Sequence, residues 1–114
     1  MKKIFGTIIA VIILVSASCA MAHSPGNLIA KYDSDTSLLW IKAPHPVANP
    51  NRHYIEEYKI YINGDKYAEL ELKNQKDKTG SEAVFYIPGL VKGDTVKIEA
   101  KCSQSGKSKT TIEI

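Results

Sequence analysis

The chain has 114 residues, 44% of them hydrophobic, with 15 basic and 12 acidic side chains. A formal net charge of +3 is too small for the basic surface of a nucleic-acid-binding domain, so that class of protein is excluded. The length allows one small domain with one modest core.

The N-terminal segment has the pattern of an export signal. Lys2 and Lys3 form a basic start, residues 4–15 are an apolar run, and Ala20-Met21-Ala22 supplies the small residues that signal peptidase requires before its cut. The apolar run is too short for a transmembrane helix, and the sequence has no second run of this kind. We therefore expect a signal peptide at residues 1–22.

Cleavage after Ala22 would release a domain of residues 23–114 into the periplasm or the medium, with no membrane association. His23 would then be the first residue and would offer a metal two nitrogens, one from the α-amine and one from the ring. Lipoprotein processing at Cys19 is a competing interpretation, because small residues precede this cysteine. Ser16, however, stands where a large aliphatic residue is usual.

The remaining sequence is typical of short strands separated by turns, since no segment has a sustained helical period. Asn63-Gly64 is the strongest hairpin signal, because both residues tolerate positive φ. The prolines within residues 44–52 indicate a loop. Clean alternation in residues 95–102 directs Cys102 inward. Strands are expected at residues 27–32, 36–43, 54–62, 67–73, 83–87, 95–102 and 110–114.

This number of strands in about 90 residues predicts an all-β fold, an immunoglobulin-like β-sandwich of about seven strands. The strand periodicity also predicts the core, which should contain Ile60, Ile62, Leu70, Leu72, Val96 and Ile98.

After cleavage, three histidines and one cysteine remain as candidates for chemistry: His23, His45, His53 and Cys102. Cys102 would have no partner for an intramolecular disulfide, and an unpaired thiol in an oxidising compartment needs burial or metal coordination to protect it. Taken alone, Cys102 fits a small buried hydrophobic residue, and each histidine fits an ordinary loop or terminal residue.

Taken together, these residues resemble the iron-binding domain of superoxide reductase and desulfoferrodoxin. The two-histidine loop of that family reads roughly PHPM followed by KHYIE, its first ligand motif is H-x-P, and it closes on C-x-x-H-G. The matching segments here are Pro44-His45-Pro46-Val47, Arg52-His53-Tyr54-Ile55-Glu56, His23-Ser24-Pro25 and Lys101-Cys102-Ser103-Gln104-Ser105-Gly106. The resemblance spans nearly the whole domain and implies an immunoglobulin-like sandwich.

The resemblance also implies a mononuclear non-haem iron centre. In the family, four histidines surround a ferrous ion in a plane, a cysteine thiolate is axial, and the open sixth position receives superoxide, which is reduced to peroxide. Carried over residue by residue, His23, His45, His53 and Cys102 match ligands. Electrons would come from an external electron donor protein, because the sequence contains no second module with four cysteines.

Two departures from the family pattern predict weaker superoxide reduction. Ser105 occupies the position of the fourth histidine, and the family's Glu-Lys pair before the first histidine is absent. In the family, that lysine helps to attract and protonate the bound oxygen species. The α-amine of His23 would be a substitute fourth nitrogen. Its reference pKa is about 7.7–8.0, so metal binding would release a proton and strengthen as the pH rises.

Other functions stay open on the residues alone. Imidazoles and a thiolate also suit copper or zinc, so a copper-binding periplasmic module is one alternative. A sandwich that binds a carbohydrate or a protein without catalysis, through aromatic residues such as Trp40, is another. Hydrolase chemistry has no support, because the sequence contains no G-x-S-x-G motif.

Overall fold

The computed structural model describes residues 25–114 of the chain. The expected signal segment 1–22, Cys19 and His23 lie outside these residues. Within the described part of the chain, no helix is long and apolar enough to cross a membrane.

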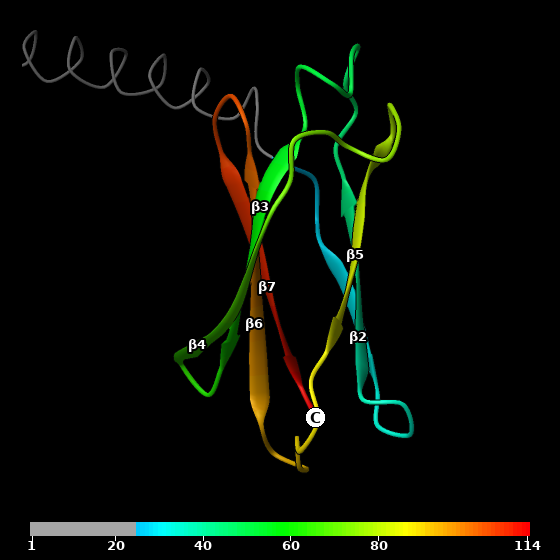
Figure 1. Ribbon diagram of the computed structural model, residues 1–114. Coiled ribbons are helices and arrows are strands. Elements are labelled where there is room, and N and C mark those ends of the chain that lie inside the picture. Colours follow the sequence, from blue (N-terminus) through cyan, green and yellow to red (C-terminus); the bar gives the residue numbers. More distant parts are fainter. Residues whose placement is uncertain (1–24) are drawn as a thin grey trace, which may run out of the picture.

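Two antiparallel sheets pack face to face (Figure 1). The three-stranded sheet has the order β1-β2-β5, and the four-stranded sheet has the order β4-β3-β6-β7. The all-β, immunoglobulin-like sandwich expected from the sequence is therefore confirmed. The strands are β1 (Ile29–Asp33), β2 (Leu38–Pro44), β3 (Ile55–Ile62), β4 (Asp65–Glu71), β5 (Gly80–Tyr86), β6 (Thr95–Cys102) and β7 (Lys107–Glu113).

The limits of β2 differ from those expected, for two local reasons. β2 begins at Leu38 rather than at residue 36, because Ser37 has a φ of 61° and belongs to the turn from β1. β2 ends on Pro44, which was expected in the loop. Pro44 pairs with Gly80 at the start of β5, and the end of a strand tolerates a residue without an N–H group.

The Asn63-Gly64 turn joins β3 to β4 as predicted. Asn63 and Gly64 have φ values of 50° and 88°, and the flanking Ile62 and Asp65 pair directly. Two successive positive φ values match the right-handed twist of the strands, which makes this a tight two-residue hairpin. The Asn63 side chain also accepts a hydrogen bond from the Thr95 N–H at 2.9 Å, which ties the hairpin to the start of β6.

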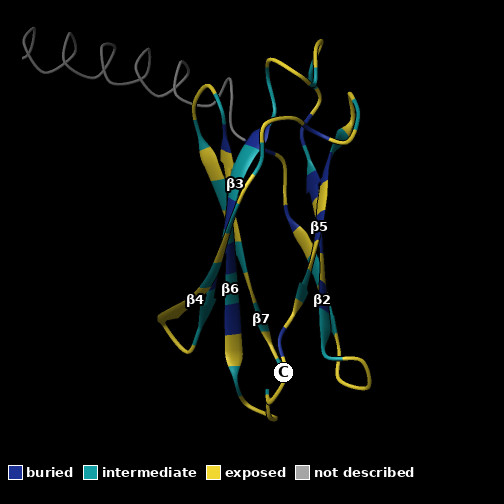
Figure 2. Ribbon diagram, viewed as in Figure 1, coloured by how far each residue is buried: buried dark blue, intermediate teal, exposed yellow. Residues whose placement is uncertain are grey.

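The core lies between the sheets, where alternate residues of β2, β3 and β6 are buried (Figure 2). Of the predicted core residues, Ile60, Val96 and Ile98 are fully buried. Each contributes about 1.5–3 kcal/mol through removal of its apolar surface from water. Ile62, Leu70 and Leu72 are partly buried and pack against this core.

Candidate metal centre

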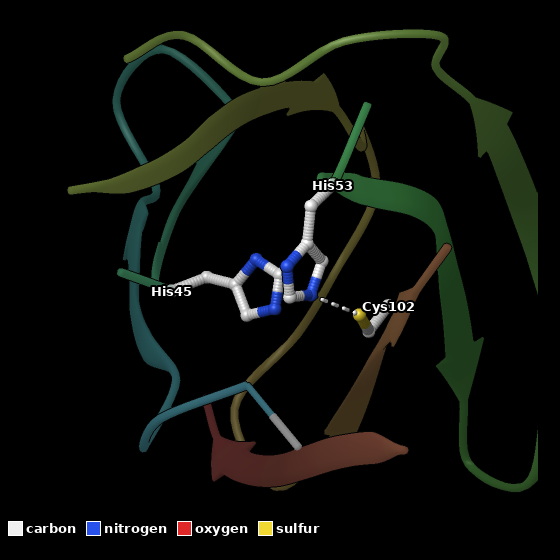
Figure 3. Close-up of side chains that lie close together, drawn as sticks. All are labelled: His45, His53 and Cys102. Atoms are coloured by element: carbon white, nitrogen blue, oxygen red, sulfur yellow. Dashed lines mark hydrogen bonds between the residues drawn. The ribbon is translucent and has the colours of Figure 1, made fainter. Parts of the chain in front are cut away.

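Three of the predicted site residues meet at one end of the sandwich (Figure 3). The ligating atoms of His45, His53 and Cys102 all lie within 4.8 Å of one another. His45 directly follows β2, His53 lies shortly before β3, and Cys102 is the last residue of β6. His45 therefore comes from the end of a strand in the three-stranded sheet. His53 and Cys102 come from just before the start of β3 and from the end of β6, which are neighbours in the four-stranded sheet.

His45 is held by a loop that runs from β4 to β5. Its backbone N–H donates to the Thr79 carbonyl at 2.9 Å, and its ring Nδ1 lies 2.8 Å from Oε1 of Gln75. The loop is itself braced, because Asp77 Oδ1 accepts the Thr79 N–H at 2.8 Å. The hydroxyl and N–H of Thr79 hold the pKa of Asp77 below its usual range. His45 is only 3% exposed, so its ring is fixed within the protein.

The β3–β6 ladder places His53 beside Cys102. Ile55 is paired with Cys102, and the next residue, Ser103, donates its N–H to the Tyr54 carbonyl at 2.8 Å. The Ser103 hydroxyl in turn accepts the Tyr54 N–H at 3.1 Å. These contacts bring Nε2 of His53 to 3.2 Å from Sγ of Cys102.

The sulfur of Cys102 is enclosed, as the alternation of β6 predicted. Cys102 is 1% exposed and is a free cysteine. The backbone N–H of Gln104 points at Sγ from 3.4 Å. An N–H donor directed at the sulfur is the kind of outer contact that orients a metal ligand. Burial also keeps the thiol away from oxidants in solution.

The donor set fits a transition metal such as iron. Bonds of about 2.1 Å and 2.3 Å to one metal would place the nitrogen and the sulfur about 3–4 Å apart. The observed separation between His53 Nε2 and Cys102 Sγ is 3.2 Å. The two imidazole rings lie 4.8 Å apart between centroids, with planes 88° apart, so they approach from different directions. Two imidazoles and a thiolate suit iron, copper or zinc.

Two further predicted positions have different outcomes. His23 lies outside the described residues, so its role as a ligand stays a prediction. Ser105, at the position of the family's fourth histidine, is exposed in the turn between β6 and β7. Gln75, which contacts His45, was not predicted. It lies in the segment from Asn74 to Gly80, which reads only as a polar loop and gives no periodic signal.

A second group of possible ligands, Glu57, Glu69 and Glu71, lies on the outer face of β3 and β4. Two of the three carboxylates form ion pairs with lysines. Lys59 pairs with Glu57 at 3.5 Å, and Lys66 pairs with Glu69, holding the pKa of Glu69 below its usual range. Surface carboxylates that pair with lysines in this way need no metal.

No protein-family model matches the chain, and no curated protein matches it in sequence. Solved structures are similar. The superoxide reductase of Giardia intestinalis has a TM-score of 0.61 at 16% identity, over 80% of this chain and 99% of that one. The superoxide reductase of Nanoarchaeum equitans has a TM-score of 0.54 at 24% identity, over 81% and 92%.

A third solved structure, the superoxide reductase (neelaredoxin) of Ignicoccus hospitalis, has a TM-score of 0.56 at 13% identity, over 79% of this chain and 80% of that one. At such identities the likeness shows the fold. The chain has the fold of superoxide reductases, and at this level the resemblance read from its motifs is confirmed.

Proposed function

We propose that this chain is an exported mononuclear iron protein that reduces superoxide to peroxide. The iron would be held by His45, His53 and Cys102, with His23 as a further ligand. The observation that most supports this function is the convergence of two imidazoles and one buried cysteine sulfur within 4.8 Å, in a fold shared with superoxide reductases.

The proposed reaction adds one electron and two protons to superoxide and gives hydrogen peroxide. A bound ferrous ion would supply the electron, and an external electron donor protein would restore it. The protein's own residues have separate tasks. His45 and His53 would present ring nitrogens from two rings whose planes lie 88° apart, and the buried Cys102 would supply a sulfur ligand shielded from water.

The start of the described chain supports a role for His23. The Gly26 N–H donates to the Pro44 carbonyl at 2.7 Å, and the Pro25 carbonyl accepts the Ser108 hydroxyl at 2.5 Å. Pro44 immediately precedes His45, so the chain at Pro25 is anchored next to the candidate centre. Two residues span at most about 7 Å, so a ligand role for His23 requires the centre to lie within reach of that anchor.

Metal binding without catalysis is a second candidate function, with copper or iron as the metal. It is favoured by the donor count, since the described residues contribute only three donors to the group, and by the exposed Ser105 at the position of the family's fourth histidine. A centre short of a nitrogen would bind the metal less tightly and in a different geometry.

The test begins with the full chain expressed with its leader in a bacterium. Mass spectrometry of the exported protein should give a chain that starts at His23, and metal analysis should find iron. Stopped-flow mixing of superoxide with the ferrous protein should then show superoxide loss that depends on Cys102. If the Cys102→Ser variant removes superoxide as fast as wild type, the reductase function is rejected. Copper in place of iron would favour the second candidate. An acylated Cys19 would show that His23 is not terminal.

A further inference from the structure

Gln75 is one of three buried polar or charged side chains in the described part of the chain, together with His45 and Ser81. It is 5% exposed and lies in a loop whose neighbouring residues, Asn74 and Lys76, are exposed. Burial of an amide is unfavourable unless its donors and acceptors are satisfied. The hydrogen bonds of Gln75 therefore show why this side chain turns inward.

The orientation of the Gln75 amide is fixed by backbone groups, because a carbonyl can only accept a hydrogen bond and an N–H can only donate one. Its Nε2 donates to the carbonyl of His45 at 2.8 Å and to the carbonyl of Asp77 at 3.0 Å. Its Oε1 accepts the backbone N–H of Ile55 at 3.2 Å. A flipped amide would set oxygen against two carbonyls and nitrogen against an N–H, and would lose all three bonds.

This orientation determines the proton position on His45. Oε1 of Gln75 accepts hydrogen bonds and cannot donate them, and it lies 2.8 Å from Nδ1 of His45. Nδ1 must therefore carry the hydrogen in the neutral ring, and the lone pair is on Nε2. Nε2 is then the nitrogen of His45 that is available to a metal.

Gln75 also connects the segments that carry both histidines. Its Oε1 bonds to the His45 ring and to the N–H of Ile55, close to His53, and its Nε2 donates to the His45 carbonyl. Its backbone N–H donates to the Pro50 carbonyl at 3.0 Å, within the proline-rich loop. One side chain thus sets the proton of His45 and the spacing between the loop and the start of β3.

We propose that Gln75 is a positioning residue of the metal centre, which holds the proton of His45 on Nδ1 and so presents Nε2 to the metal. The assignment of a metal to Nε2 rests on the proposed function, whereas the proton position does not. Partners of this kind orient ligating histidines, and their loss weakens metal binding by about 10–100-fold.

The first test uses metal-free protein produced from the full chain with ¹⁵N-labelled histidine. Long-range ¹H–¹⁵N spectra distinguish a ring proton on Nδ1 from one on Nε2, and a His45→Gln variant assigns the signals. We expect Nδ1–H in the wild type and in Gln75→Glu, which keeps an acceptor. We expect a mixture in Gln75→Met, which has none. A wild-type proton on Nε2 would overturn the proposal without any variant.

The second test titrates the same proteins with Co²⁺ against a chelator. Gln75→Met should bind Co²⁺ about 10–100-fold more weakly than wild type, and Gln75→Glu should lie between them. Asn74→Met, which removes an exposed amide from the same loop, should match wild type. Unchanged affinity and proton position in Gln75→Met would overturn the proposal. If wild type binds no Co²⁺, the proposed function fails, and the proton position alone decides the role of Gln75.

Discussion

The Nε2 atom of His53 lies 3.2 Å from the sulfur of Cys102, although 49 positions of sequence separate the two residues. The β3–β6 ladder sets this distance. Ile55 pairs with Cys102, and Ser103 bonds to both the carbonyl and the N–H of Tyr54. The pair is thus part of the sandwich framework. A metal would not have to assemble it from mobile loops, which lowers the entropic cost of binding.

Replacement of Cys102 by serine should therefore weaken metal binding without unfolding the domain. The β6 backbone pairing is unchanged, but the thiolate is lost. Loss of an outer partner alone costs about 10–100-fold in affinity, so loss of a ligand should cost more than about 100-fold. The measurement is a Co²⁺ titration that follows the thiolate-to-metal absorption band. A band that survives in Cys102→Ser would show that the sulfur is not a ligand.

Substitution of Gly80 should disturb the site through the backbone. A Cβ atom at Gly80 would overlap the carbonyl oxygen of Ala43 and lie 3.2 Å from the Cα of Pro44, the residue before His45. Relief of this overlap must move the end of β2. We expect Gly80→Ala to cost about 1–3 kcal/mol of unfolding free energy. It should also reduce Co²⁺ affinity by at least about tenfold, as loss of an outer partner does.

Gly64→Ala is the matched control for this effect. Gly64 has a φ of 88° and nothing within 4 Å of an added Cβ, so the substitution only strains the turn. That strain costs about 1–2 kcal/mol, similar to the cost expected at Gly80. Gly64 lies at the hairpin between β3 and β4, so Co²⁺ affinity should stay at the wild-type value. Equal losses of affinity in both variants would mean that general destabilisation, and not displacement of His45, is responsible.

The sequence contains most of the information about the sandwich and part of the information about the site. Alternation in residues 95–102 correctly predicted a buried Cys102, and Asn63-Gly64 predicted the hairpin. These signals are local, because strand periodicity and turn chemistry depend on adjacent residues. The order of the histidine and cysteine motifs predicted a convergence that periodicity alone could not, since it joins residues from both sheets.

Gln75 and Pro44 show what local signals miss. The partners of the Gln75 amide are His45, Ile55 and Asp77, of which two are far away in sequence. A polar loop gives no sign that one of its side chains turns inward. Pro44 belongs to β2 only because Gly80 lies opposite it, a relationship set by strand register. Both features depend on tertiary contacts, which override local preference.

The buried hydroxyl of Tyr58 gives a prediction about stability. Tyr58 is fully buried, and its hydroxyl is the one buried side-chain polar atom of residues 25–114 without a hydrogen-bond partner. An unsatisfied buried group costs about 1–3 kcal/mol. Tyr58→Phe should therefore be at least as stable as wild type at pH 7. Denaturant unfolding followed by Trp40 fluorescence measures this. A large loss of stability would show that the hydroxyl has a partner, for which the side chain of Ser81, which lowers the pKa of Tyr58, is the candidate.

The same tyrosine predicts a loss of stability in alkali. Burial raises the pKa of Tyr58 from 10.0 to about 12. The tyrosine ionises at a lower pH in the unfolded chain than in the folded protein. Its contribution to stability is therefore complete below the pKa of the unfolded chain and is lost as the pH rises toward the pKa in the folded protein. Between pH 10 and 12, wild type should lose about 2–3 kcal/mol more than Tyr58→Phe. Tyr86→Phe, at an exposed position, should behave as wild type. Parallel curves for wild type and Tyr58→Phe would contradict the shift.

The last prediction concerns the missing histidine. Ser105 is exposed in the turn that follows Cys102, at the position where the resemblance places a fourth imidazole. Ser105→His should add a nitrogen donor to the group of His45, His53 and Cys102. We expect tighter iron binding and faster loss of superoxide in stopped-flow mixing with the ferrous protein.

Lys107→His is the control for Ser105→His, because it adds the same imidazole two residues further on, at an exposed position of β7. It should change neither affinity nor rate. Tighter iron binding with an unchanged rate in Ser105→His would favour metal binding without catalysis. If neither property changes, the turn does not direct residue 105 toward the centre.

The fourth nitrogen would then have to come from elsewhere, and the α-amine of a processed His23 is the donor to test next. That donor predicts affinity that rises with pH as the amine, with its ordinary pKa of about 7.7–8.0, loses its proton.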